Sequence, residues 1–264
     1  MFVVMLAAGV LYLRMPPPTP PDVRYAATEG REVAYRVLGS GRPVLVMIAG
    51  LGDGMATFQD VAEELSRHAT VIVYDRAGYG ASASANPPRD AIAISRELEA
   101  VLRQSGVQAP YVLLGHSTGG LYAEYFAATH PADIEGLILE ESRSIDFTQR
   151  CLATPDIGMC GPPVALLWLS QAGALPEFEA LGRTYDEVRY SVPLRGRSVL
   201  ILSKFRSAQN QSGFDALWSK EQDALVRRYP GAMHLIAPTG GHQVHVDARD
   251  WFVLSIREFL ARIR

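Results

Sequence analysis

Several features that mark particular classes of protein are scarce or missing in this sequence. Two cysteines among 264 residues are too few for a four-thiolate metal site. A formal net charge of −3 and a pI of about 6.1 leave no basic surplus of the kind that binds nucleic acid. The sequence also has no pattern typical of metal, flavin, nicotinamide or phosphate binding. We therefore expect no cofactor, no metal and no nucleic-acid partner.

The two cysteines, Cys151 and Cys160, leave two interpretations open. The stretch between them contains Pro155 and Gly158, and its length allows a small looped disulfide. Two free thiols are the preferred expectation for a cytosolic protein, because disulfides persist mainly in oxidising compartments. The choice therefore depends on where the protein resides.

Long apolar runs are scarce too, and the one at the N-terminus bears on localisation. Phe2 to Leu13, twelve residues, is apolar throughout, which is too short for a comfortable membrane span but suits an export signal or a short anchor. The proline run of residues 16–21 follows as a stiff spacer. Positive residues before the apolar core and a clear cleavage site are missing, so a tail or a strand packed on the domain stays an alternative. We expect an exported or membrane-anchored protein, periplasmic or extracellular, and leave its oligomeric state open.

The rest of the composition suits one large α/β domain, with 48% hydrophobic and 20% charged residues. From residue 22 on, short apolar or alternating runs predict strands, and apolar residues at helical spacing predict helices. The strands are expected at 22–28, 31–38, 43–49, 70–74, 111–115, 134–140, 198–202 and 233–237. The helices are expected at 57–68, 89–105, 118–129, 213–228 and 247–263. This alternation predicts a mostly parallel central sheet flanked by helices.

The alternation breaks between residues 142 and 195. This stretch contains five prolines and both cysteines, and it is far longer than an ordinary connection between two strands. Helical patterns cover about 164–171 and 177–188. We interpret 142–195 as a small helical lid inserted before the last strands. The domains are then an N-terminal segment at 1–21, a core at 22–141 and 196–264, and the lid.

One turn in the core has the form of a catalytic elbow. An apolar strand from Tyr111 runs into Gly115-His116-Ser117-Thr118-Gly119, and a helix follows directly. A serine in such a turn is held in a strained backbone conformation that exposes its hydroxyl above the end of the sheet. Gly115 and Gly119 fit this interpretation, because a Cβ at either position would collide where strand and helix approach closely. Ser117 is therefore the candidate nucleophile.

Five motifs in order extend the pattern over residues 31–262: Gly50-Leu51-Gly52 after an apolar strand, Asp75-Arg76-Ala77-Gly78-Tyr79-Gly80, the elbow, Gly136 to Glu141, and Gly240-Gly241-His242 to Asp247. Together they resemble a serine hydrolase or esterase of the α/β-hydrolase fold superfamily. The resemblance implies a carboxylesterase-type enzyme that needs no cofactor and acts on a small-molecule ester.

A serine needs a base to take its proton during attack. His242 follows a strand and two glycines, where a turn can bring an imidazole over the elbow, and it matches the catalytic histidine of the family. His245 is the rival among the six histidines, but it falls where the family often has a second, non-catalytic histidine. We favour His242.

The acid that orients this histidine is harder to assign. Most members of the family carry it in the turn after the strand that follows the lid, here residues 203–210, which contain no carboxylate. Other members carry it after the preceding strand, and spacing from Gly136 aligns Glu141 with that position. Neighbouring residues of a strand face opposite sides, so Glu140 and Glu141 should not share the role. We predict Glu141, then Glu140, with Asp215 and Asp146 less favoured.

The oxyanion hole requires two backbone N–H groups. The residue after the nucleophile, Thr118, supplies one, and the resemblance assigns the other to Leu51. Ser117 would then attack an ester carbonyl, His242 would move protons, and water would release the acyl group. The apolar lid residues, Leu166, Leu167, Trp168 and Phe178, predict a hydrophobic acyl or alcohol group.

Other functions of this fold stay open. A slow or inactive hydrolase fold that binds a small apolar ligand is one, because the usual acid turn is empty. A peptidase would need lid carboxylates to hold the substrate amine, and those available, Glu177, Glu179, Asp186 and Glu187, fall where a solvated helical face would place them. A cofactor-free peroxidase or lyase is the third.

Overall fold

The computed structural model describes residues 20–155, 157–158, 160–206 and 213–263. The apolar N-terminal run, the prolines before residue 20 and part of the turn at 203–210 therefore lie outside the described residues. Within the described ranges, no helix combines the length and the apolarity needed to cross a membrane.

The centre of the molecule is one eight-stranded sheet with the strand order β1-β2-β4-β3-β5-β6-β7-β8. The first two strands pair antiparallel, as do β2 and β4, and every later neighbour pairs parallel. The strands are β1 (Arg24–Thr28), β2 (Arg31–Leu38), β3 (Val44–Ile48), β4 (Thr70–Tyr74), β5 (Tyr111–His116), β6 (Ile134–Glu140), β7 (Ser198–Ser203) and β8 (Met233–Ile236). The predicted α/β-hydrolase architecture with a mostly parallel sheet is confirmed.

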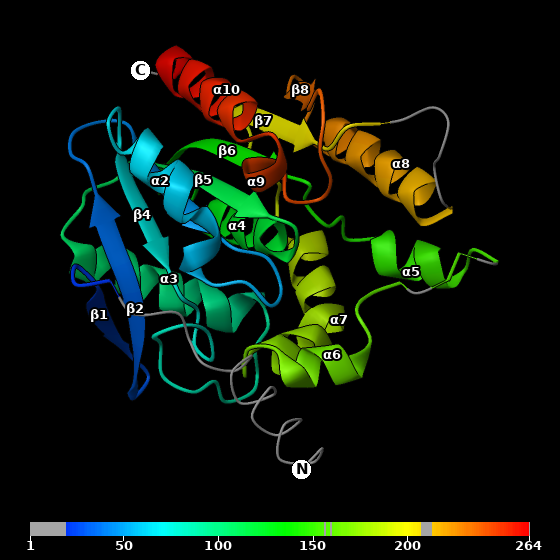
Figure 1. Cartoon of the computed structure of the whole chain (residues 1–264), viewed down its shortest axis with the longest axis horizontal. Coiled ribbons are helices and arrows are strands. Elements are labelled where there is room, and N and C mark those ends of the chain that lie inside the picture. Colours follow the sequence, from blue (N-terminus) through cyan, green and yellow to red (C-terminus); the bar gives the residue numbers. More distant parts are fainter. Residues whose placement is uncertain (1–19, 156, 159, 207–212, 264) are drawn as a thin grey trace, which may run out of the picture.

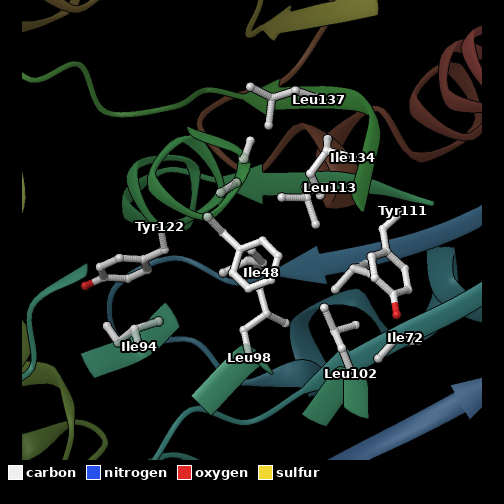
Figure 2. Packing of buried hydrophobic residues seen from close by; sticks show 14 of the residues in the cluster. Ile48, Ile72, Ile94, Leu98, Leu102, Tyr111, Leu113, Tyr122, Ile134 and Leu137 are labelled. Carbon is white, nitrogen blue, oxygen red and sulfur yellow. The ribbon is translucent and has the colours of Figure 1, made fainter. Parts of the chain in front are cut away.

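Helices cover both faces of the sheet (Figure 1). One face packs against α3 (Ala91–Ser105), α4 (Thr118–Thr129) and the end of α8 (Gly213–Arg228). Figure 2 shows Ile94 and Leu98 of α3 lying against Ile48 of the sheet in this cluster. The other face packs against α2 (Gln59–Leu65) and α10 (Arg249–Arg262). Because both faces are covered, β3, β4 and β5 are buried along their whole length and consist of nearly continuous apolar runs.

Short elements complete the core. A 3-10 turn, η1 (Met55–Phe58), precedes α2, and a second, η2 (Pro131–Asp133), precedes β6. The helix expected from residue 247 is split, because α9 (Val244–Asp247) ends before α10 begins.

The stretch from 142 to 195, called the insertion below, forms three helices: α5 (Phe147–Leu152), α6 (Val164–Leu169) and α7 (Ala174–Tyr190). The last two correspond to the predicted helical patterns, whereas α5 was not predicted. The α7 helix packs against α3 and α4, and α5 packs against α8. A disulfide joins Cys151 at the end of α5 to Cys160, with the Cα atoms 5.7 Å apart. The structure thus decides between the two interpretations of the cysteines.

Candidate active site

Ser117 occupies the sharp turn between β5 and α4. Its backbone lies at φ 53° and ψ −120°, a conformation that L-residues adopt only when the surroundings enforce it. Close packing of strand and helix enforces it here, because a Cβ at Gly115 would lie only 2.5 Å from the carbonyl oxygen of Gly119. The hydroxyl of Ser117 therefore projects above the carboxyl end of the sheet, as the elbow pattern predicts.

Two more of the predicted residues lie beside this serine. Nε2 of His242, on the loop between β8 and α9, is 3.0 Å from Oγ of Ser117. Nδ1 of His242 is 3.3 Å from Oε2 of Glu141. Glu141 is fully buried directly after β6, also at a positive φ of 43°. Ser117, His242 and Glu141 thus form one chain of hydrogen-bonding atoms.

The turn without an acid takes part in this arrangement in another way. The backbone N–H of Lys204, directly after β7, donates to Oε1 of Glu141 at 2.8 Å. In place of a carboxylate, this turn supplies a donor that orients the carboxylate of the neighbouring strand. This hydrogen bond fixes the orientation of the Glu141 carboxylate toward the imidazole of His242.

Glu140 and His245, the second choices for acid and base, pair with each other. Nδ1 of His245 lies 2.7 Å from Oε1 of Glu140, and the backbone N–H of His245 donates to the same oxygen at 2.8 Å. Nε2 of His245 is 3.1 Å from Oγ1 of Thr57. Both side chains are fully buried. Burial alone would raise the pKa of Glu140, but the adjacent His245 and His116 and the two hydrogen bonds from His245 hold it below its usual value.

His116, the residue before the candidate nucleophile, supports the histidine loop. Its Nε2 lies 3.1 Å from the backbone carbonyl oxygen of His242, which makes the ring nitrogen the donor. Burial lowers the pKa of His116 to about 3, so the ring stays neutral at physiological pH. The sequence placed His116 only inside the elbow motif, and no pattern indicated this contact with a loop 126 positions away.

His116, Glu140 and His245 are also the one group of described residues whose ligand atoms could hold a metal ion, lying within 4.8 Å of one another. Oε1 of Glu140 already accepts two hydrogen bonds from His245, and the imidazole of His245 is bonded at both nitrogens. These hydrogen bonds account for His245 and for one oxygen of Glu140, whereas Oε2 of Glu140 and Nδ1 of His116 are buried without a partner among the described residues.

The predicted oxyanion-hole residues lie next to each other. Thr118 is the first residue of α4, so its N–H belongs to the helix N-terminus, where backbone amides have no partner inside the helix. The N–H of Leu51 donates to the side-chain hydroxyl of Thr118 at 2.8 Å. The hydroxyl of Thr118 is thus the present acceptor for the N–H of Leu51. A substrate oxygen would have to displace this hydroxyl in order to accept the same hydrogen bond.

Arg76 fixes the main chain that carries Leu51. Its two terminal nitrogens donate to the carbonyl oxygens of Ala49 and Gly50 at 2.7 and 2.8 Å. Nε and Nη2 of the same guanidinium bind both carboxylate oxygens of Glu177 at 2.8 and 2.9 Å. The prediction of a solvated position for Glu177 is therefore wrong, since this side chain on α7 of the insertion is fully buried against Arg76. The bidentate geometry explains why a charged residue is stable there.

Asp215 and Asp146, the less favoured candidates for the acid, pair elsewhere. Asp215 on α8 contacts the side-chain amine of Lys204. Asp146 pairs with Arg189 at the end of α7 at 2.8 Å.

A cavity of about 500 Å³ opens over Ser117, between the end of the sheet and the insertion. Its floor contains Ser117, His242 and both predicted oxyanion residues. Most of the remaining wall is apolar and comes from the insertion and α8: Gly161, Pro162, Pro163, Leu166, Leu181, Phe214 and Trp218. Two cationic side chains, Arg143 and Lys204, complete it. Among the described residues that line the cavity none is acidic.

Residues 43–263 match the model of the alpha/beta hydrolase fold family. The chain belongs to this family. It is 22% identical to a thermophilic esterase from Thermogutta terrifontis, solved with malate bound, with a TM-score of 0.67 over 91% of this chain and 98% of that one. An esterase from Exiguobacterium antarcticum is 17% identical, with a TM-score of 0.67 over 90% of this chain and 98% of that one. At these identities the two structures establish the shared fold.

Among curated relatives of this α/β hydrolase, the Bacillus subtilis protein YbdG is 30% identical over 112 residues, 42% of this chain and 34% of YbdG. The chain spans between 34% and 48% of the length of the first three curated relatives that it matches. These partial matches do not identify the substrate or the activity, which have to be argued from the residues of the site.

Proposed function

We propose that the protein is a serine hydrolase that cleaves a carboxylic ester through an acyl-enzyme, with Ser117 as nucleophile, His242 as base and Glu141 as acid. The observation that carries the proposal is the continuous set of contacts from Ser117 Oγ to His242 Nε2 at 3.0 Å and from His242 Nδ1 to Glu141 at 3.3 Å. Such contacts let the imidazole take the serine proton during attack.

The steps follow from these positions. Ser117 Oγ attacks the ester carbonyl while His242 accepts its proton, and the N–H groups of Leu51 and Thr118 stabilise the negative charge that develops on the carbonyl oxygen. His242 then gives the proton to the leaving alcohol. Water, deprotonated by the same imidazole, releases the acyl group. Glu141, held in place by the N–H of Lys204, orients His242 and stabilises the transient imidazolium.

A hydrophobic substrate is part of the proposal. The cavity wall offers apolar surface to an acyl chain or alcohol through Gly161, Pro162, Pro163, Leu166, Phe214 and Trp218. Each buried methylene of a substrate contributes about 0.8 kcal/mol of transfer free energy. The rate constant kcat/KM should therefore rise with chain length over short and medium esters until the cavity is filled.

The decisive experiment compares p-nitrophenyl esters of increasing chain length with wild type and the variants Ser117→Ala, Glu141→Gln and Glu140→Gln. We expect Ser117→Ala to be inactive and Glu141→Gln to lose about 10⁴-fold in kcat, because the wrong tautomer of His242 is then favoured. Glu140→Gln should lose far less, since Glu140 contacts His245 and not His242.

Three outcomes would contradict parts of this proposal. Full activity of Glu141→Gln would assign the acid elsewhere. A flat dependence on chain length would refute the hydrophobic substrate. An inert wild type that binds apolar ligands would favour the non-catalytic alternative.

We also propose that the protein functions in an oxidising compartment. The Cys151–Cys160 disulfide supports this, because such bonds persist mainly outside the reducing cytosol. Cell fractionation tests it, and recovery of the protein with reduced thiols in the cytosol would contradict it.

A further inference from the structure

One cation in the wall of the cavity has no role in the proposed chemistry. Arg143 follows the acid Glu141 by two positions, and its backbone N–H donates to the carbonyl oxygen of Ser117 at 3.0 Å. Its side chain is buried and lines the same cavity as the nucleophile. The residue is thus anchored at the elbow, with its guanidinium directed along the wall that the insertion provides.

Neutral groups hold this guanidinium in a fixed orientation. Nε donates to the hydroxyl of Tyr185 at 2.6 Å, and Nη2 donates to Oγ1 of Thr148 at 2.7 Å and to the carbonyl oxygen of Cys160 at 3.1 Å. The guanidinium carbon lies 4.8 Å from the ring centre of Phe147. These contacts use three of the five N–H groups of an arginine, and none of the acceptors is charged.

Arg143 differs from the other buried arginines in its charged partners. Across the described parts of the chain, no carboxylate lies within ion-pair distance of Arg143, whereas the buried Arg76 and Arg89 each have one. Nη1 has no hydrogen-bond partner among the described residues, and Arg143 lines the cavity. A buried, unpaired charge is costly, and proteins retain one mainly where a ligand completes the pair.

The surroundings favour an anion at this position. Lys204, the other charged residue of the cavity wall, is already paired with Asp215, and the described lining contains no acidic side chain that would repel an anion. The Nη1 of this fixed guanidinium keeps two N–H groups that can donate charge-assisted hydrogen bonds to a carboxylate oxygen.

We infer that Arg143 binds a carboxylate of the substrate, so that the natural substrate class is an ester with a free carboxylate, such as the monoester of a dicarboxylic acid. This inference rests on the proposed esterase function and narrows it. The apolar wall would contact the methylene chain between the two ends, while Ser117 attacks the ester end and Arg143 holds the acid end. A substrate of this class has an apolar middle and a negative charge at one end. These features match the apolar wall of the cavity and the positive charge of Arg143.

The test compares the monomethyl esters of succinic, glutaric and adipic acids with the matched methyl esters in which the free acid is replaced by a primary amide. Wild type should prefer the anionic member of at least one pair by about 10- to 100-fold in kcat/KM, the range expected for a charge-assisted hydrogen bond. In Arg143→Gln this ratio should fall to about one, and Arg143→Lys should retain part of it. Arg183→Gln, an exposed arginine on α7 that lies outside the cavity, is the matched control and should leave both rates and the ratio unchanged.

The readouts separate this inference from the proposed function. Turnover of the neutral esters without a preference for the anionic ones in any pair would overturn the role of Arg143 and leave the esterase intact. Equal losses on both members of a pair in Arg143→Gln would mean that the residue is only structural. If wild type turned over neither, calorimetry would decide: adipic acid monoamide must bind wild type more tightly than adipamide does, and equal or absent binding would refute the inference.

Discussion

Two adjacent glutamates at the end of β6 serve two histidines of one short segment. Glu140 pairs with His245 and Glu141 with His242, so neighbouring residues of the strand meet residues three positions apart beyond β8. The pleat of a strand directs neighbouring side chains to opposite sides, and the carboxylate of Glu141, which follows the strand at a positive φ, contacts His242. The pair of Glu140 and His245 is fully buried in the core. In the other pair, Glu141 is buried and His242 lies at the cavity with 43% of its side chain exposed.

This division predicts different losses when either histidine is removed. His242→Ala should reduce kcat by about 10⁴-fold or more, because it removes the base. His245→Ala should instead lower the free energy of unfolding by about 3–5 kcal/mol, because Glu140 then remains as a buried charge without its partner. Chemical denaturation and ester turnover measured on both variants check this. A larger loss of kcat in His245→Ala than in His242→Ala would reverse the assignment.

At the scale of elements, buried charges join the insertion to the loop after β3 that carries Leu51. Glu177 of α7 binds Arg76 after β4, accepts a hydrogen bond from the hydroxyl of Tyr79 at 2.8 Å, and lies 3.4 Å from Arg89. The same Arg76 holds the carbonyl groups that precede Leu51. The guanidinium of Arg76 therefore positions both the insertion and the main chain that carries Leu51, the proposed oxyanion-hole residue.

Glu177→Ala should lower the free energy of unfolding by about 3–5 kcal/mol, because it leaves Arg76 buried without its carboxylate. It should also lower kcat, since the main chain that carries Leu51 loses its fixed support. Glu179→Ala, on the exposed side of the same helix, is the control and should change stability by less than about 0.5 kcal/mol. Equal stability of the two variants in thermal or urea unfolding would contradict the role assigned to Glu177.

For the molecule as a whole, the buried groups beneath the site predict loss of stability in acid. The folded chain keeps His116 neutral down to a pKa of about 3, whereas the unfolded chain takes up a proton near pH 6.5. Between these values the unfolded state binds more protons, so the free energy of unfolding falls by about 1.4 kcal/mol for each pH unit of acidification. The lowered pKa of Glu140 adds a loss in the same direction below its usual value of 4.5.

Urea unfolding between pH 7 and pH 5 measures this slope. His116→Gln should flatten it, although the half-buried His234, whose pKa burial also lowers, will retain some of it. An unchanged slope in His116→Gln would show that other groups dominate the acid sensitivity.

Much of the fold was predictable from the sequence, because the central strands β3, β4 and β5 are buried on both faces and are nearly continuous apolar runs. The elbow was visible as well, since the geometry around Ser117 requires glycines at fixed positions. Contacts between distant segments were not: the burial of Glu177 depends on Arg76, 101 positions away, and its sequence surroundings resemble those of the exposed Glu179. The α5 helix gave no periodic signal because it buries only Phe147 and Cys151, whereas the equally short α6 is apolar along its whole length. The catalytic roles of Ser117, His242 and Glu141 stay predictions, to be decided by the variants above.

The ion pair between Arg76 and Glu177 has a consequence for turnover. An insertion fixed by charges that water does not reach cannot hinge away from the core in every catalytic cycle, because separating the pair would cost several kcal/mol. Substrate must then enter and product leave through a permanent opening, and Leu166, which lines the cavity yet is 58% exposed, marks where the cavity meets solvent. Product release should thus be a matter of diffusion past α6, and the catalytic cycle should be paced by the acyl-transfer steps rather than by the motion of a gate.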